Sequence, residues 1–345
     1  MKVLSPFFIC LLRDRVARAL ALAACVLLAF APAGTPTAFA SLHHQRGGVA
    51  VVGPNAQPRP FADRLRLLNV GWYYDYSYRL DDEVYGTSKV AVLRGGESNR
   101  APLDQVAAQA RSKPGHYWIV FNEPDLEGQD LVSDRFLAAR GQQRFDYYAQ
   151  IFHEYVTTLK AADPTAKVVA PNLFNWGGSY RGWIDGFRAA YRARYLGEPP
   201  IDVWALHLYS FDPSWKKLPA IDLAYSQRLY LDFRDYVRSL PGHQTTPIWA
   251  TEVGTIWGYR DIYQGPDGLF RGTSYAWPEI RDYLAELIPW LEREGVDRWF
   301  LFGTNPAPDP WAGVANALYL LDDAGRPTEA GRLLADGTVL AMAAR

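Results

Sequence analysis

Eight short apolar segments recur along the chain, and their number and spacing constrain the fold more than any other feature of the sequence. Each segment is nearly continuous in hydrophobicity rather than alternating, which is the pattern of strands buried on both faces of a parallel sheet. The segments are Gly48–Val52, Leu68–Tyr74, Lys89–Leu93, Tyr117–Phe121, Lys167–Ala170, Asp202–Leu208, Ile248–Thr251 and Arg298–Phe302.

Helical patterns fill several of the intervals between these segments. Arg144–Ala162 carries apolar residues at helical spacing and is followed by Asp163-Pro164, which predicts its end. The other predicted helices are Gly182–Tyr195, Tyr225–Leu240, Trp277–Glu294 and, as a weaker last member, Thr328–Leu340. The interval between the second and third segments is too short for a regular helix.

Alternating strands and helices predict an α/β fold, namely a (β/α)8 TIM-type barrel with an irregular side between the second and third strands. The competing fold is an open doubly wound sheet. Such a sheet normally carries a glycine-rich phosphate turn, and neither G-x-G-x-x-G nor G-x-x-x-x-G-K-[ST] occurs here. We find no composition break or internal repeat, so we expect a flexible stretch over 41–47 and one catalytic barrel over 48–345.

The first 40 residues have the anatomy of a secretory signal peptide. Lys2, Arg13, Arg15 and Arg18 precede an apolar stretch from Ala19 to Ala31, and Ala38-Phe39-Ala40 forms an A-x-A cleavage site. The apolar stretch is too short for the roughly 20 residues of a spanning helix. We therefore expect export, cleavage after Ala40 and no membrane attachment. Lipoprotein anchoring at Cys25, in the box Leu22-Ala23-Ala24-Cys25, is the alternative.

Composition excludes several classes of protein. Both cysteines, Cys10 and Cys25, lie in the signal segment, so the mature chain has no disulfide, thiol nucleophile or cysteine metal site. The segment also holds four of the 36 basic and one of the 37 acidic residues, which leaves 32 and 36. This near-neutral balance without a basic cluster argues against nucleic acid as a partner. The six histidines lack metal-site spacing, so we expect neither metal nor cofactor, and a monomer.

Polar residues that core packing does not require end three of the predicted strands. Glu123 follows the fourth, His207 and Tyr209 end the sixth, and Glu252 ends the seventh. The carboxyl ends of the strands form the active-site face of such a barrel, so carboxylates there indicate catalysis. A two-residue periodicity places Ile248, Ala250 and Glu252 on one face, as it does Ile119, Phe121 and Glu123, and Val203, Ala205, His207 and Tyr209.

Two glutamates on different strands suit the cleavage of a glycosidic bond. One must be protonated near neutral pH to donate to the leaving oxygen, and the other must be ionised to attack the anomeric carbon. The structural alternative for Glu123 is a helix or turn cap, and for Glu252 it is a salt bridge to an arginine at the barrel rim, such as Arg94.

Three stretches resemble a known group of enzymes. Val70-Gly71-Trp72-Tyr73-Tyr74, Phe121-Asn122-Glu123-Pro124-Asp125-Leu126 and Trp249-Ala250-Thr251-Glu252-Val253-Gly254 are similar to glycoside hydrolase family 128 and the Asl1-like catalytic domains of clan A. The resemblance implies a retaining double displacement on a β-linked sugar. It also implies that Glu123 is the acid/base, that Glu252 is the nucleophile, that Asn122 contacts the 2-hydroxyl, and that His207 and Tyr209 tune the nucleophile or bind sugar. Arg94-Gly95-Gly96 departs from the family pattern, where an aromatic residue is expected.

Further residues at strand ends are candidate ligands of the substrate. Arg94 is placed to hold the Glu252 carboxylate, or else to form a surface ion pair. Trp72 lies in the second segment, and Trp176 and Trp257 follow the fifth and seventh. All three are expected to stack on sugar rings, with rim packing as the alternative. Asn172 and Asn175 are expected to bind sugar hydroxyl groups.

The sequence thus predicts a secreted, retaining β-glycosidase that acts on a poly- or oligosaccharide. A β-1,3-glucan is the substrate that the resemblance favours, and a β-xyloside or another hemicellulose is the alternative. The two carboxyl groups are expected about 5 to 5.5 Å apart, the spacing of retaining enzymes. A rival of another class is a non-catalytic, secreted carbohydrate-binding protein that kept the barrel.

Overall fold

The structure is a computed structural model that describes most of the chain from Arg46 to Asp336. The described residues are 46–51, 65–80, 87–177, 181–210, 221–255, 263–267, 270–271, 273, 275–304, 319–322 and 324–336. By its contacts the chain divides into Met1–Ser41 and Leu42–Arg345, and every described residue belongs to the second unit. The predicted signal peptide, its cleavage site and Cys25 lie outside the described residues, as do most of the stretch 41–47 and Trp257.

Nine parallel strands form the main sheet in the order β3-β2-β1-β11-β8-β7-β6-β5-β4. They are β1 (Gly47–Ala50), β2 (Trp72–Tyr74), β3 (Ser88–Lys89), β4 (Ala91–Leu93), β5 (Tyr117–Val120), β6 (Lys167–Leu173), β7 (Val203–Tyr209), β8 (Ile248–Gly254) and β11 (Arg298–Phe302). All eight predicted strands are present, because β3 and β4 together form the third.

The two ends of this order meet in one segment of chain. Only Val90 separates β3 from β4. On one side of this segment the Val90 amide donates to Tyr73 O at 2.9 Å, and on the other the Phe121 amide donates to Leu93 O at 2.8 Å. Ser88–Leu93 therefore pairs with β2 and with β5, which closes the sheet into an eight-stranded barrel. The predicted (β/α)8 architecture is confirmed.

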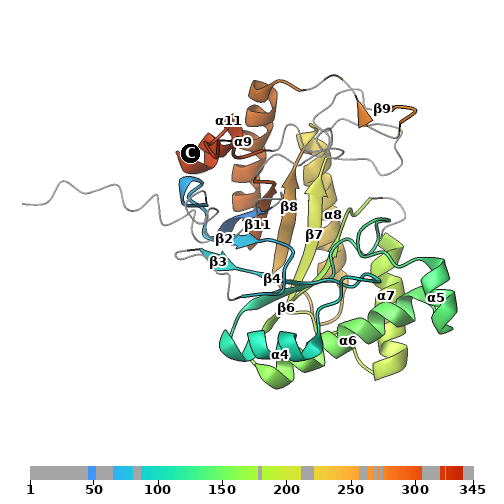
Figure 1. The fold of residues 1–345 in the computed structure, drawn as a ribbon. Coiled ribbons are helices and arrows are strands. Elements are labelled where there is room, and N and C mark those ends of the chain that lie inside the picture. The colour runs from blue at the N-terminus through green and yellow to red at the C-terminus, as the bar shows by residue number, and fades with distance from the viewer. Residues whose placement is uncertain are drawn as a thin grey trace, which may run out of the picture. The chain divides into compact units, whose positions relative to one another are not determined.

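Helices lie outside the strands (Figure 1). They are α4 (Leu103–Ser112), α5 (Asp134–Arg140), α6 (Arg144–Ala162), α7 (Arg181–Tyr195), α8 (Leu223–Ser239), α9 (Trp277–Arg293) and α11 (Glu329–Ala335). The five predicted helices match α6, α7, α8, α9 and α11 to within a few residues where they are described. The prediction missed α4 and α5. These two helices contain few large apolar residues. A short hairpin, β9 (Tyr263–Gln264) with β10 (Phe270–Arg271), lies in the long loop after β8.

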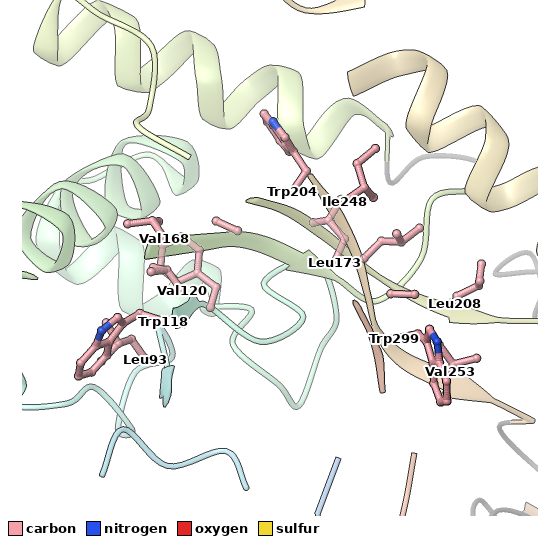
Figure 2. Close-up of a cluster of buried hydrophobic side chains, with 14 of the residues drawn as sticks. Leu93, Trp118, Val120, Val168, Leu173, Trp204, Leu208, Ile248, Val253 and Trp299 are labelled. Carbon is pink, nitrogen blue, oxygen red and sulfur yellow. The ribbon is translucent and has the colours of Figure 1, made fainter. Parts of the chain in front are cut away.

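Buried apolar side chains form two layers, one on each face of the barrel wall. The larger layer includes the buried faces of the helices together with every second strand residue, such as Trp118 and Val120 of β5, which Figure 2 shows beside Val168 of β6. The smaller layer contains no helix residue, and therefore fills the barrel. Its buried members are Ala50, Tyr74, Val90, Val92, Ile119, Val169, Val203, Ala205, Trp249 and Phe300.

An ion pair occupies the side of the barrel where no regular helix was expected. Residues 75–80, which follow β2, are not helical. On the outward face Lys89 lies opposite Tyr73, is fully buried, and its Nζ lies 2.8 Å from Asp75 Oδ2.

None of the described helices combines the length and the apolar character needed to cross a bilayer.

Candidate active site

A β-bulge turns Glu252 into the barrel. Trp249 belongs to the interior layer, whereas Ile248 and Ala250 belong to the outward one. Leu206 of β7 pairs with Ala250, but the next residue, His207, pairs with Glu252, so Thr251 is inserted between them. A bulge reverses the alternation of side chains beyond it. The prediction that Ile248, Ala250 and Glu252 share a face was therefore wrong, although Glu252 does face inward.

A second bulge lies across β7 from the first. Pro171 pairs with Ala205 and Leu173 pairs with Leu206, which leaves Asn172 as the extra residue, with φ at 57°. The Thr251 hydroxyl donates to Asn172 Oδ1 and, at 3.1 Å, to Leu206 O. The two bulges thus contact each other between the ends of β6 and β8.

Glu123 reaches the same place by a left-handed turn. Ile119 faces inward, but Phe121 faces outward, where its ring lies 5.3 Å from that of Tyr148 and 6.2 Å from that of Phe152. The predicted shared face of Ile119, Phe121 and Glu123 was therefore wrong. Phe121 has φ at 76° and Glu123 at 50°, and the Glu123 amide donates to Asn172 O at 3.0 Å. Positive φ is uncommon for such residues and marks a turn that the surrounding structure enforces.

The two glutamates and His207 meet at the carboxyl ends of β5, β7 and β8. His207 Nδ1 lies 2.8 Å from Glu123 Oε1 and 3.2 Å from Glu252 Oε2. One oxygen of each carboxyl group and the imidazole nitrogen all lie within 4.8 Å of one another. His207 is fully buried, and Glu123 and Glu252 are 5% and 4% exposed. The expected convergence of these residues is present in the structure.

Three tyrosines surround the carboxylate of Glu252. Tyr209 donates to Oε2 at 2.5 Å and Tyr76 to Oε1 at 2.7 Å. The Tyr74 hydroxyl donates to Thr251 O at 2.6 Å and lies 3.3 Å from Oε1. Tyr209 was predicted here, whereas Tyr74 and Tyr76 were missed. The available signal was their two-residue spacing, since Tyr74 ends β2 and Tyr76 follows on the same inward side.

Burial and hydrogen bonding separate the two carboxyl groups. Burial raises the pKa of Glu123 to about 8, with Arg94 lowering it and Asp130 raising it. Burial also raises the pKa of Glu252, but His207 and the hydrogen bonds from Tyr209 and Tyr76 oppose this rise. Donors to a carboxylate favour its ionised form. These surroundings favour the protonated form of Glu123 and oppose protonation of Glu252.

His207 is neutral in this arrangement, since burial lowers its pKa to about 4. A neutral imidazole has one N–H, and Nδ1 faces both carboxyl groups, so we place the proton on Nδ1. Nε2 is buried and has no hydrogen-bond partner among the described residues. His207 thus acts as a neutral donor between the two acids.

The same three side chains are close enough to ligate one metal ion, and they are the one such group in the described parts of the chain. Their carboxyl oxygens already accept hydrogen bonds from His207, Tyr76 and Tyr209. Protein donors thus already occupy these carboxyl oxygens.

Asn122 and Asn172 are buried beside the two glutamates and are hydrogen-bonded to each other. Asn172 is fully buried, and its Nδ2 donates to Asn122 Oδ1 at 3.2 Å. Asn122 is 2% exposed and donates Nδ2 to Gln129 at 3.3 Å. Asn122 lies directly before Glu123, and its contact with the sugar 2-hydroxyl stays a prediction, whereas the side chain of Asn172 bonds within the protein. Asn175 is also fully buried, and its Oδ1 accepts from the Gly177 amide at 2.7 Å. The prediction of Asn172 and Asn175 as sugar ligands finds no support here.

Arg94 does not hold Glu252. Its Nε lies 2.6 Å from Asp130 Oδ1, and its Nη2 donates to Gln129 at 3.2 Å. The alternative of an ion pair after the strand was the right one, although this pair is largely buried rather than on the surface, with Asp130 fully buried.

Two of the three tryptophans predicted to stack on sugar rings, Trp72 and Trp176, pack against other side chains of the protein. Trp72 opens β2, at the amino end of the barrel, where its ring centroid is 5.8 Å from that of Tyr117 and 6.3 Å from that of Trp249. The Arg298 guanidinium lies 4.4 Å from the Trp72 ring. Trp176 is 1% exposed and packs against Phe233 and Tyr236 of α8. Both therefore pack within the protein, which was the alternative for each, and Trp257 lies outside the described residues.

Known proteins of similar sequence and structure match this architecture. The profile of the glycosyl hydrolase catalytic core matches residues 59–333. An endo-β-1,3-glucanase of family 128, subgroup II, from Pseudomonas viridiflava is 25% identical, with a TM-score of 0.56 over 84% of this chain and 96% of that one. A subgroup I endo-β-1,3-glucanase from Amycolatopsis mediterranei, solved with laminaritriose, is 19% identical, with a TM-score of 0.56 over 85% and 99%.

A third solved structure is a curdlan-specific exo-β-1,3-glucanase of subgroup III from Blastomyces gilchristii, solved with glucose. It is 19% identical, with a TM-score of 0.55 over 85% of this chain and 98% of that one. Among curated proteins, none matches the chain. The resemblance to family 128 is confirmed by these matches. The family profile covers most of the chain, and a buried pair of glutamates lies at the carboxyl ends of the barrel strands. The chain belongs to the glycosyl hydrolase catalytic core family and is a glycosidase.

Proposed function

We propose that this glycosidase hydrolyses a β-1,3-glucan with retention of configuration, using Glu123 as acid/base and Glu252 as nucleophile. The observation that carries the proposal is the unequal surroundings of two adjacent carboxyl groups. Glu252 accepts two tyrosine hydrogen bonds, and burial raises the pKa of Glu123 to about 8. One group is thus prepared to attack and the other to donate a proton.

The separation of the two groups supports retention over inversion. Retaining glycosidases hold their carboxyl groups about 5 to 5.5 Å apart, whereas inverting enzymes need roughly 6.5 to 9.5 Å to admit a water molecule. Oxygens of Glu123 and Glu252 lie within 4.8 Å of each other. This gap leaves too little room for the water molecule that, in an inverting enzyme, lies between the base carboxylate and the anomeric carbon.

The reaction then follows two displacements. The Glu252 carboxylate attacks the anomeric carbon while Glu123 gives its proton to the departing oxygen, and an ester forms between the sugar and Glu252. Glu123, now ionised, takes a proton from water, whose oxygen attacks the anomeric carbon and releases Glu252. Through both steps His207 donates from Nδ1 to whichever carboxyl group carries the negative charge, because it contacts both.

The substrate is proposed from the similar structures, which are described as β-1,3-glucanases. The alternative is a β-xyloside or another hemicellulose of the same clan. Incubation with laminarin, curdlan, mixed-linkage glucan and xylan, followed by chromatography of the products, tests this directly. Laminari-oligosaccharides from the wild-type protein and none from Glu252→Ala would support the proposal, whereas xylo-oligosaccharides alone would overturn the substrate.

The same experiment separates the enzyme from a carbohydrate-binding protein. Binding alone gives no reason for a shared proton between two glutamates, which argues against that rival. Tight binding of a β-glucan with no reducing ends released by the wild-type protein would establish the rival instead.

We further propose that the chain is exported, cleaved after Ala40 and monomeric. The charged start, the apolar stretch and the A-x-A site support export. Mass spectrometry of protein from the culture medium should give a chain that starts at Ser41. A diacylated cysteine at Cys25 would show lipoprotein anchoring instead.

A further inference from the structure

Asp130 is a buried carboxylate that no step of the proposed reaction uses, and it receives four hydrogen bonds. Its Oδ1 accepts from Arg94 Nε at 2.6 Å and from Asn99 Nδ2 at 3.2 Å. Its Oδ2 accepts from the backbone amides of Gly95 at 2.7 Å and Asn122 at 2.8 Å. The side chain is fully buried. So complete a set of donors shows that this side chain ties several segments together.

The segments that Asp130 joins are the ends of two neighbouring strands. Gly95 follows β4, and Asn122 follows β5 immediately before Glu123. The Asp130 amide also donates to Asn122 O at 3.2 Å, so both sides of the Asn122 backbone are held. The Tyr148 hydroxyl of α6 donates to Asp130 O at 2.7 Å and fixes Asp130 in turn. Glu123 therefore starts from a backbone that cannot shift without breaking these bonds.

We propose that Asp130 and Arg94 are positioning residues for Glu123, in that Asp130 fixes the turn that carries the acid and the two opposite charges act on it through space. The proposal rests on the proposed acid/base role of Glu123. The family pattern does not anticipate this role for Arg94. Arg94 was first expected to hold the nucleophile, Glu252, and is here assigned to Glu123 instead.

The two charges act on Glu123 in opposite directions. The Arg94 guanidinium lowers the pKa of Glu123 and the Asp130 carboxylate raises it, against the dominant effect of burial. The other titratable groups that interact with Glu123 are not substituted in this test. They are His207 on β7, Glu252 on β8, Tyr76 after β2, Tyr209 on β7 and Asp125 in the same turn.

The experiment compares the pH dependence of kcat/KM on a soluble β-1,3-glucan for Asp130→Asn, Arg94→Gln and the double variant. Its basic limb reports the acid in the free enzyme. We expect Asp130→Asn to move this limb to lower pH and Arg94→Gln to higher pH, each by about 0.5 unit or more. The double variant should return close to the wild-type limb. A purely structural role would lower activity in all three without this reversal of sign.

Two controls make the result specific. Arg94→Lys keeps the charge but loses the second hydrogen bond, so activity should fall while the limb stays in place. Arg100→Gln removes an arginine that pairs with Glu154 at 2.7 Å on α6 and should leave the limb unchanged. If Asp130→Asn does not fold, as judged by its circular dichroism, the Arg94 variants still carry the test.

Failure of this inference can be told from failure of the proposed function. The carboxyl carbon of Glu123, labelled with 13C and assigned through Glu123→Gln, titrates in NMR spectra whether or not the protein turns over. Opposite shifts of this titration in the two single variants support the inference even if no glucan is cleaved. If neither the basic limb of kcat/KM nor the titration of Glu123 shifts in folded Arg94→Gln, the inference is wrong, even if the protein is an active β-1,3-glucanase.

Discussion

The Tyr209 hydroxyl lies 2.5 Å from Oε2 of Glu252, and both residues are nearly or fully buried. The two residues face each other across neighbouring strands only because the bulge at Thr251 brings Glu252 into the barrel opposite His207. A short hydrogen bond to a charged acceptor, with little water to compete, is strong. It favours the ionised Glu252 that nucleophilic attack requires.

Loss of the tyrosine donors should weaken catalysis unequally. Tyr209→Phe and Tyr76→Phe each remove a donor within 2.7 Å of Glu252, whereas the shorter bond of Tyr74 goes to Thr251 O. We expect kcat/KM to fall about 10- to 100-fold in the first two variants, as for a hydrogen bond to a charged group. The acidic limb should also move to higher pH. Tyr283→Phe, which loses a bond to Ser226 instead, is the matched control. Equal losses in Tyr209→Phe and Tyr283→Phe would contradict this role.

The pH profile of the wild-type protein should report Glu123. Burial raises the pKa of this acid to about 8, so kcat/KM should fall as the pH rises through about 8 and the proton is lost. Asp125 has a pKa raised to a similar value by burial, and its Oδ1 accepts from the Phe174 amide. Asp125→Asn should therefore keep the limb, whereas Glu123→Gln should abolish it. If the basic limb disappeared in Asp125→Asn and not in Glu123→Gln, the titrating acid would be Asp125 and the assignment to Glu123 would be wrong.

The free energy of unfolding should decline as the pH rises from about 4.5 to about 8. The pKa of Glu123 is about 8 in the folded protein against an ordinary value of 4.5, so the native state binds this proton more tightly than the unfolded state. The resulting stabilisation is full below about pH 4.5 and is lost as the pH rises through about 8. It changes by about 1.4 kcal/mol per pH unit for one group. Denaturant unfolding at pH 5, 6.5 and 8 should show a smaller decline for Glu123→Gln, and parallel declines would refute the shift.

A pair of helical glycines should respond oppositely to alanine. A Cβ on Gly331, in α11, would lie 2.0 Å from the backbone oxygen of Leu320, whereas nothing lies within 4 Å of one on Gly182, in α7. Gly331→Ala should lower the free energy of unfolding by about 1 to 3 kcal/mol or more. Gly182→Ala should raise it by about 0.4 to 1 kcal/mol. A stable Gly331→Ala would show that α11 packs less closely against Leu320.

The barrel could be predicted because its strands depend on local apolar runs, which the sequence displays directly. The missed helices, α4 and α5, show the limit of this reasoning. In α4 only Val106 and Ala110 are buried, and in α5 only Leu137. Such helices are fixed mainly by their position against neighbouring elements, which no local periodicity records.

The site was predicted more accurately than the faces on which its residues lie. Counting by two placed Glu252 inside the barrel only because two errors cancelled, since Ala250 faces outward and Thr251 forms a bulge. Bulges and left-handed turns depend on contacts between strands, such as that between Thr251 and Asn172. Arg94 likewise pairs with Asp130, 36 residues away. Sequence spacing alone does not predict such partners.

The roles of the two glutamates can be tested most directly by replacing each with alanine and supplying azide as a small nucleophile. On an aryl β-glucoside with a good leaving group, Glu123→Ala should form a β-glycosyl azide, because Glu252 still makes the covalent intermediate. Glu252→Ala should instead give an α-glycosyl azide, because azide takes the place of the nucleophile. Azide products of the reverse configurations, or full activity in either variant without azide, would contradict the assignment of Glu123 and Glu252.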